Sequence, residues 1–157
     1  MSLQFPWFST VFGVYVWSGA VVGGMGMLSI LIVIMQRRSL QDRVDDATFH
    51  SLGLLTFAFT VFWAYIAFSQ FFLIWYANLP EETSFFNARW VGPWKIISVL
   101  LIALRFVIPF VALMTARSKR RPRLVVGMGL VILAGQYLDL YWMVMPNRSA
   151  DGLGRLM

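Results

Sequence analysis

The residues with the greatest capacity for chemistry are a few polar side chains inside long apolar stretches. Arg105 lies near the middle of one such stretch, and Asp139 is the only acidic residue inside any of them. A charged side chain at the bilayer centre costs at least roughly 2.5–3.5 kcal/mol without compensation. We therefore predict that Arg105 and Asp139 pair, directly or through water. The alternative is that Asp139 only caps a helix or makes a hydrogen bond near the membrane surface.

Neutral polar residues accompany this pair in two short segments. Tyr65, Ser69 and Gln70 interrupt one apolar run, and Gln136 and Tyr137 precede Asp139 in another. A glutamine facing lipid would leave its amide unsatisfied, so Gln70 must point into protein, a cavity or a ligand. Two interpretations stay open: an interhelical hydrogen bond of about 1 kcal/mol, or the lining of a quinone or proton path. The candidate residues for such a path are Tyr65, Ser69, Gln70, Arg105, Gln136, Tyr137 and Asp139.

The elements that must position these residues are four apolar runs. Of the 157 residues, 59% are hydrophobic and 13% are charged, whereas soluble domains average about half and a quarter. Each run reaches the roughly 20 residues that a membrane span needs. The sequence predicts an all-α integral membrane protein, a single membrane domain over 1–157 with four transmembrane helices forming a bundle. The runs are 11–35, 52–77, 91–116 and 124–145.

Cysteine and histidine usage limits the chemistry of this chain. There is no cysteine and one histidine, His50, which excludes disulfides, iron–sulfur ligation, a catalytic thiol and ligation of haem by two histidines of this chain. We expect no catalytic residue and no metal site. Any redox centre would belong to another subunit.

The basic residues are distributed unequally between the two ends of the predicted bundle. Eight lie in the loops 36–51 and 116–123, and four lie at the other end. This is the positive-inside pattern, so we expect those loops in the cytoplasm and both termini, with the loop 78–90, outside. The eight are Arg37, Arg38, Arg43, Arg117, Lys119, Arg120, Arg121 and Arg123, and the four are Arg89, Lys95, Arg148 and Arg155.

Small residues and prolines mark places where helices approach or break. Gly19, Gly23 and Gly26 share one helix face, which predicts a close contact with another helix, inside or outside this chain. Pro109 donates no hydrogen bond, so the helix ladder should break near Arg105 and kink there. Pro80 should end the second span, and the aromatic loop after it would suit docking of an outer partner.

Four segments together resemble one protein family. They are WFSTVFGVYVWSG (7–19), LGLLTFAFTVFWAYIAFSQFFLIWYANLPEET (52–83), RFVIPF (105–110) and DLYWMVMP (139–146). They closely resemble the ActF subunit of alternative complex III, a bacterial quinol:cytochrome c oxidoreductase, within the wider NrfD and polysulfide-reductase-C type of membrane proteins. The resemblance covers essentially the whole chain and corresponds to the C-terminal part of longer members.

The resemblance implies a subunit of the bacterial inner membrane rather than an enzyme by itself. It implies partners that include a multihaem cytochrome c, an iron–sulfur subunit, an NrfD-like membrane subunit and lipids. Haem c and iron–sulfur clusters would sit in those partners. Quinone contact and proton translocation would involve polar residues of the bundle.

The chain departs from the family pattern at several ionisable positions. Gln4, Pro6, Ser51 and Leu54 stand where charged residues are frequent in the family, and Arg105 and Gln136 stand where histidines are common. Arginine and glutamine do not exchange protons near neutral pH. A second interpretation is therefore a purely structural scaffold subunit of a respiratory or photosynthetic complex. A third is a small ion-coupled transporter, which should show paired halves with broken helices.

Overall fold

The computed structural model describes residues 11–38, 46–87, 89–90, 92–115, 119 and 121–154, and these are almost entirely helical, with no strand among them. The expectations for Gln4, Pro6, Arg43, Arg117, Arg120 and Arg155 lie outside this part of the chain. The elements are α1 (Phe12–Arg38), α2 (Asp46–Ala77), α3 (Pro80–Asn87), α4 (Trp94–Ile102), a π turn η1 (Ala103–Val107), α5 (Ile108–Leu113) and α7 (Pro122–Gly154).

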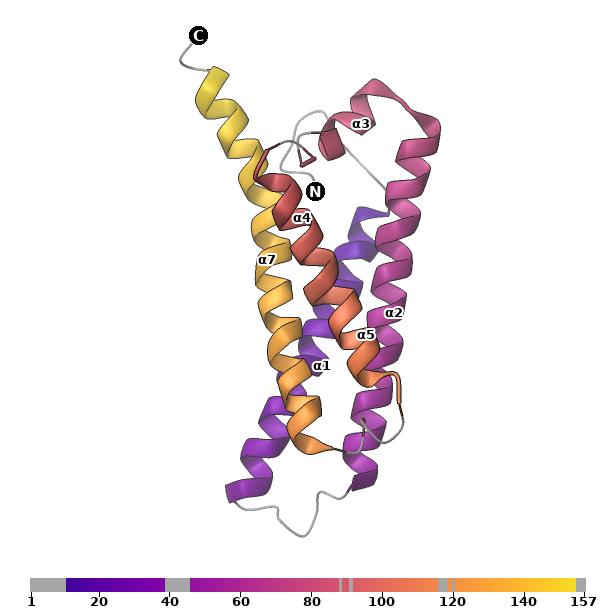
Figure 1. Cartoon of the computed structure of the whole chain (residues 1–157), viewed down its shortest axis with the longest axis vertical. Helices are drawn as coiled ribbons and strands as arrows, with labels where there is room; N and C mark the ends of the chain where they lie inside the picture. Colours follow the sequence, from indigo (N-terminus) through magenta and orange to yellow (C-terminus); the bar gives the residue numbers. More distant parts are fainter. Residues whose placement is uncertain are drawn as a thin grey trace.

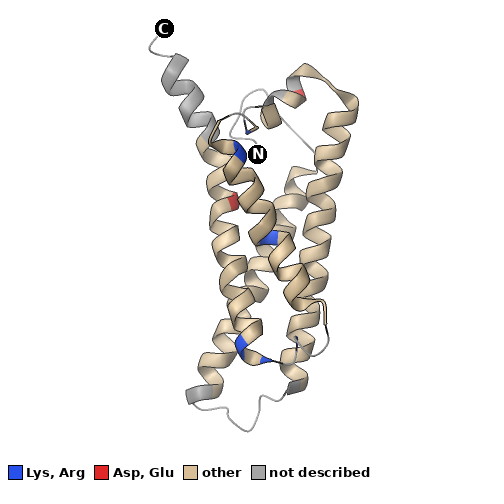
Figure 2. Ribbon diagram, in the orientation of Figure 1, with Lys and Arg blue, Asp and Glu red and all other residues tan. Residues whose placement is uncertain are grey.

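Four helical rods are long and apolar enough to cross a membrane, which confirms the predicted all-α membrane bundle. They span Phe12–Gln36, Ala47–Ala77, Trp94–Leu113 and Pro122–Met145. Their outer surfaces carry many exposed large apolar side chains, such as Ile96 (72% exposed) and Val111 (65%). Coloured by charge, the bundle is neutral along most of its length (Figure 2). Such a surface suits hydrocarbon as the surrounding solvent.

Successive rods run antiparallel, so α1 and the rod of α4 and α5 run in one direction and α2 and α7 run in the other (Figure 1). In Figure 1, α3 lies at one end of the bundle with the first residues of α1 and α4, and the first residues of α2 and α7 lie at the opposite end. Helix α1 packs most extensively on α7 and then on α2, while η1 and α5 contact both α2 and α7. The central apolar cluster contains Tyr15, Val22, Trp63 and Ile132, all at most 8% exposed.

The contact between α1 and α7 depends on paired glycines. A Cβ atom built on Gly26 would lie 3.0 Å from the carbonyl oxygen of Gly129, and one built on Gly129 would lie 2.7 Å from the carbonyl oxygen of Gly26. The Ser29 hydroxyl donates a 2.7 Å hydrogen bond to the same Gly26 oxygen. The predicted close helix contact therefore exists and lies inside this chain, because the backbones meet where neither residue has a side chain.

The helix irregularity predicted near Pro109 takes the form of a π turn. The N–H of Ile108 donates to the carbonyl of Ala103, five residues earlier, and Arg105 lies within this turn. Pro109 follows directly and supplies no donor of its own, so the regular ladder is interrupted in the same region. Arg105 is the buried residue of this turn, with 1% of its surface exposed.

Two expected loops are partly helical. Helix α2 begins at Asp46, six residues before the predicted start of the span, because a helix continues through polar residues beyond the hydrocarbon. The segment expected as the outer loop 78–90 contains α3. Asn78, with φ of 49°, ends α2 in the left-handed conformation that asparagine tolerates. Pro80 then occupies the first position of α3, where its missing N–H costs nothing.

Enlarging Gly129 should separate α1 from α7. We expect Gly129→Ala to lower the free energy of unfolding by about 1–3 kcal/mol, the usual cost of overpacking, since the new methyl group would meet the Gly26 backbone. The matched control is Gly127→Ala on the same helix, where an added Cβ has no neighbour within 4 Å. Thermal unfolding in lipid nanodiscs measures both, and equal midpoints would contradict the contact.

Candidate functional site

The predicted pair of charges is present at the centre of the bundle. Arg105 Nη2 lies 3.7 Å from Asp139 Oδ2, and both side chains are almost completely buried. Arg105 lies eleven residues after the start of α4, about 16 Å along the rod, and eight residues before the end of α5, about 12 Å. The pair therefore lies well inside the apolar length of the helices, where each charge compensates the other.

Two glycines make room for the guanidinium. A Cβ on Gly19 of α1 would lie 2.8 Å from Arg105 Nη2, and a Cβ on Gly135 of α7 would lie 2.9 Å from Arg105 Cδ. The Arg105 side chain thus passes between two helix backbones that carry no side chain on the facing side. Its Cζ atom also lies 4.4 Å from the ring centre of Trp63, within the range of a cation–π contact.

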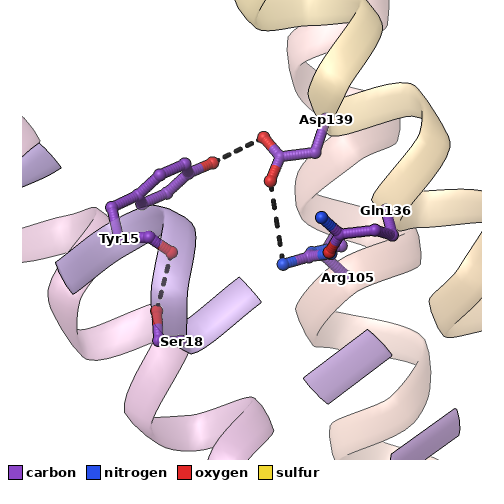
Figure 3. Close-up of polar contacts among 5 residues, drawn as sticks. All are labelled: Tyr15, Ser18, Arg105, Gln136 and Asp139. Atoms are coloured by element: carbon purple, nitrogen blue, oxygen red, sulfur yellow. Dashed lines mark hydrogen bonds and ion pairs between the residues drawn. The ribbon is translucent and has the colours of Figure 1, made fainter. Parts of the chain in front are cut away.

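Tyr15 completes the site from the first helix. Its hydroxyl donates a 2.6 Å hydrogen bond to Asp139 Oδ1, so one carboxylate oxygen faces a phenol and the other faces a guanidinium (Figure 3). Arg105 Nη1 donates to Gln136 Oε1, one helical turn before Asp139. The Ser18 hydroxyl donates back to the Tyr15 carbonyl and needs no partner elsewhere. Three rods therefore contribute to one polar centre of Tyr15, Arg105, Gln136 and Asp139, which we call the polar core.

Three buried donor atoms in and beside the polar core have no acceptor in the described part of the chain. Arg105 Nε and Nη2 and Trp63 Nε1 are buried without a hydrogen-bond acceptor among the described residues. The 3.7 Å separation between Arg105 and Asp139 is an ion pair but too long for a hydrogen bond. An additional neutral acceptor, such as an ordered water, would suit this place, because the two formal charges already cancel.

The other predicted residues occupy different positions. Gln70 is buried, as expected, and lines a cavity rather than the polar core. Ser69 is half-buried beside it. Tyr65 and Tyr137 are 64% and 76% exposed, so neither lies in the polar core, although Tyr65 borders the cavity. A tyrosine is amphipathic, and a mainly apolar ring on the outer surface carries a smaller penalty than an amide or a charge would.

The glycines predicted for helix packing lie along the polar core. Gly19 faces Arg105 and Gln136, Gly23 faces the Gln136 side chain, and Gly26 faces Gly129. The row thus serves two purposes: it lets α1 approach α7, and it leaves space for the polar side chains that α7 and η1 direct inward.

A second buried cation, Arg89, lies at the end of the bundle where α3 is found (Figure 1), and the sequence placed it only in the loop 78–90. Arg89 is 1% exposed, and its guanidinium donates to the carbonyl oxygens of Phe85 (2.7 Å), Trp142 (3.2 Å) and Met143 (3.1 Å). In a regular helix, the carbonyl of Trp142 would accept a hydrogen bond from the N–H of residue 146. Pro146 has no N–H, and the Arg89 guanidinium donates to this carbonyl instead. Burial lowers the pKa of the Arg89 guanidinium to about 10, opposed by the nearby Tyr15, and the group stays charged at neutral pH.

Tyr15 and Arg89 are the site residues that sequence reasoning missed. Tyr15 lies four residues before Gly19 on the same helix face, a spacing that could have placed its hydroxyl toward the glycine contact. Arg89 gave no comparable signal, because its acceptors are carbonyls more than fifty residues away on α7. His50, the one histidine, lies near the start of α2 and takes no part in the polar core. Among the described residues, no cluster of three His, Cys, Asp or Glu could hold a metal ion.

Removing the Tyr15 hydroxyl should weaken the polar core. We expect Tyr15→Phe to lower the free energy of unfolding by about 1.5–3 kcal/mol, the range for hydrogen bonds to charged groups. The control is Tyr137→Phe, the same change at a 76% exposed position, which should have no measurable effect. Chemical unfolding in mixed micelles compares the two, and equal losses would show that the Tyr15 hydrogen bond does not contribute.

Replacing Arg89 by lysine should loosen α7 around Trp142 and Met143. A lysine keeps the charge but cannot donate to three carbonyls from one planar group. We expect Arg89→Lys to raise the rate of backbone hydrogen exchange around Trp142–Met145, whereas Arg123→Lys, at an exposed position, leaves it unchanged. Unaltered exchange in both variants would contradict the role of Arg89 as the substitute donor.

Comparison with known proteins identifies no family for this chain. The sequence matches no protein-family model and no curated protein.

Proposed function

We propose that this chain is an integral membrane subunit of a quinol:cytochrome c oxidoreductase of the alternative complex III type, and that Asp139 and Tyr15 form a proton-holding site within it. The observation that carries the proposal is the polar core itself. A carboxylate, a guanidinium and a phenol are gathered inside apolar helices at a place where each is costly alone. Intramembrane ionisable residues of this kind are typical of proton and substrate paths.

The roles within the polar core differ. Asp139 is the group that can take up a proton, whereas Arg105 does not release one near neutral pH. Tyr15 donates to Asp139 and also lines the neighbouring cavity. A proton that reaches the Tyr15 hydroxyl oxygen can pass on to Asp139 in one concerted step, in which Tyr15 accepts the incoming proton as it gives its own hydroxyl proton to Oδ1, so that no phenolate is formed. Gln136 holds the guanidinium in place.

The partner subunits and cofactors of the proposal follow from the resemblance of the four sequence segments to the ActF subunit. The multihaem cytochrome c, the iron–sulfur subunit and an NrfD-like membrane subunit would supply haem c and iron–sulfur clusters, and quinol would be the electron donor. The exposed apolar surface supports contact with lipids and with membrane partners. The exposed Arg121 and Arg123 lie where α7 begins, which favours that end as the cytoplasmic side of a bacterial inner membrane. The outer end with α3 would then face the periplasm.

A scaffold subunit is the second candidate. It is favoured by the composition of the polar core, in which Arg105 and Gln136 do not titrate near neutral pH. It is also favoured by the 76% exposure of Tyr137, which removes this residue from an interior path.

The proposed function is tested first by co-purification and then by substitution. The tagged chain, extracted in mild detergent from its own host, should carry c-type haem and iron–sulfur subunits with it. In that complex, Asp139→Asn should lower the number of protons moved per electron, because the amide cannot take up a proton, whereas Tyr137→Phe should not. If the Asp139→Asn complex assembles and moves an unchanged number of protons per electron, the scaffold function is supported instead. If the tagged chain purifies without haem subunits, the proposal that it belongs to this complex is wrong.

A further inference from the structure

A third buried cation, Lys119, lies at the end of the bundle where α2 and α7 begin. By sequence it belongs to the basic loop 116–123, yet its side chain is 7% exposed. Its backbone N–H donates to the Thr115 carbonyl (3.4 Å), just beyond the end of α5. A Cβ atom built on Gly53 of α2 would lie 3.0 Å from the Lys119 Cβ, so the missing side chain of Gly53 makes room for this lysine.

The Lys119 side chain extends from Gly53 toward the apolar part of the bundle. Its ammonium nitrogen lies 4.5 Å from the centre of the Phe57 ring, one helical turn further into α2. The Phe57 ring stacks on Phe110 of α5, with 5.4 Å between the ring centres. Phe110 precedes the end of the apolar span at Leu113 by three residues, about 5 Å. The ammonium therefore lies close to the level at which hydrocarbon gives way to lipid headgroups.

This ammonium has no counter-ion among the described side chains. The ion pair found there joins Arg105 to Asp139, and the contact of Lys119 Nζ is the Phe57 ring. A lysine is almost never buried to this extent unless it is paired, and a cation–π contact offsets part of the cost of removing the charge from water. Nζ is not among the enclosed nitrogen atoms without a partner, which belong to His50, Trp63 and Arg105. An anion can therefore approach it from outside.

We propose that Lys119 binds the phosphate of an anionic phospholipid, whose acyl chains lie along α2 and α5. The site does not depend on the proposed function. Lysine is a common phosphate ligand, which it binds as a point charge. The side chains beside the two stacked rings suit acyl chains, because they are apolar and exposed: Leu54 (49%), Val111 (65%) and Met114 (63%).

The surroundings of Lys119 favour a lipid over free phosphate. Free phosphate would have to leave water for a place beside two phenylalanine rings, with one ammonium as its ligand among the described residues. The phosphate of a phospholipid is already at this level of the membrane, and its acyl chains cover apolar surface. Arg121 and Arg123 are exposed two and four residues further along the chain. Their positive charge favours a lipid with net negative charge over a zwitterionic one.

Native mass spectrometry of the full chain in mild detergent tests this site. The protein is titrated with phosphatidylglycerol or with phosphatidylcholine of the same acyl chains, and the lipid-bound fractions give two dissociation constants. We expect phosphatidylglycerol to bind more tightly by about fivefold or more, the effect usual for one basic residue at an anionic surface. Lys119→Met removes the charge but keeps an apolar stem, so it should abolish most of this preference, whereas Lys119→Arg should retain it. Lys119→Gln, which is also neutral, replaces Lys119→Met if that variant does not fold.

The matched control is Lys95→Met. Lys95 is the other lysine of the chain, is exposed near the start of α4 at the opposite end of the bundle (Figure 1), and also faces an aromatic ring, that of Trp90, at 5.9 Å. Its loss should leave the preference unchanged, which separates the site from the general attraction of anionic lipid to a chain with a net charge of +6.

Three results would overturn the site. The first is equal affinity of the wild-type chain for the two lipids, and the second is an effect of Lys119→Met no larger than that of Lys95→Met. The third is displacement of phosphatidylglycerol by millimolar inorganic phosphate, because the site would then take free phosphate and not a lipid.

Discussion

The cost of an arginine inside hydrocarbon determines much of the interior of this bundle. Arg105 is about 12 Å or more from either end of its rod, so its charge must be compensated inside the protein. Asp139 supplies the opposite charge, Gln136 an acceptor and Trp63 an aromatic face. Breaking a buried ion pair on one side typically costs 3–5 kcal/mol, because the remaining charge is left uncompensated. The need to compensate the Arg105 charge therefore fixes how the helices around it are arranged, in addition to their apolar packing.

Backbone features accommodate the same residue. Arg105 lies in the π turn at Ala103–Val107, and Gly19 and Gly135 leave space for its side chain on two sides. A larger residue at either position would collide with the guanidinium or with its stem. The π turn and the two glycines thus accommodate the same buried arginine. Such local departures from regular structure are frequent at functional sites.

The fold could be predicted from the sequence to a large extent, because long apolar runs permit few alternatives in lipid. The ion pair was also predictable, since two isolated charges in apolar helices require each other. The partner of Gly26 was not fixed by the sequence, because a row of small residues identifies a contact face and not what it meets. Helix α3 was missed since a polar segment after Pro80 has the composition of a loop. Arg89 could not be assigned a role, because its carbonyl acceptors are defined only by tertiary structure.

The central claim is that Arg105 and Asp139 are tolerated in the membrane because each compensates the other. A double-mutant cycle with Arg105→Met and Asp139→Leu, measured as free energies of unfolding in lipid bilayers, tests it most directly. We expect each single variant to lose about 3–5 kcal/mol and the double variant to lose less than the sum by at least about 1.5 kcal/mol. Strict additivity of the two losses would contradict the account, because it would mean that the two side chains are stabilised independently.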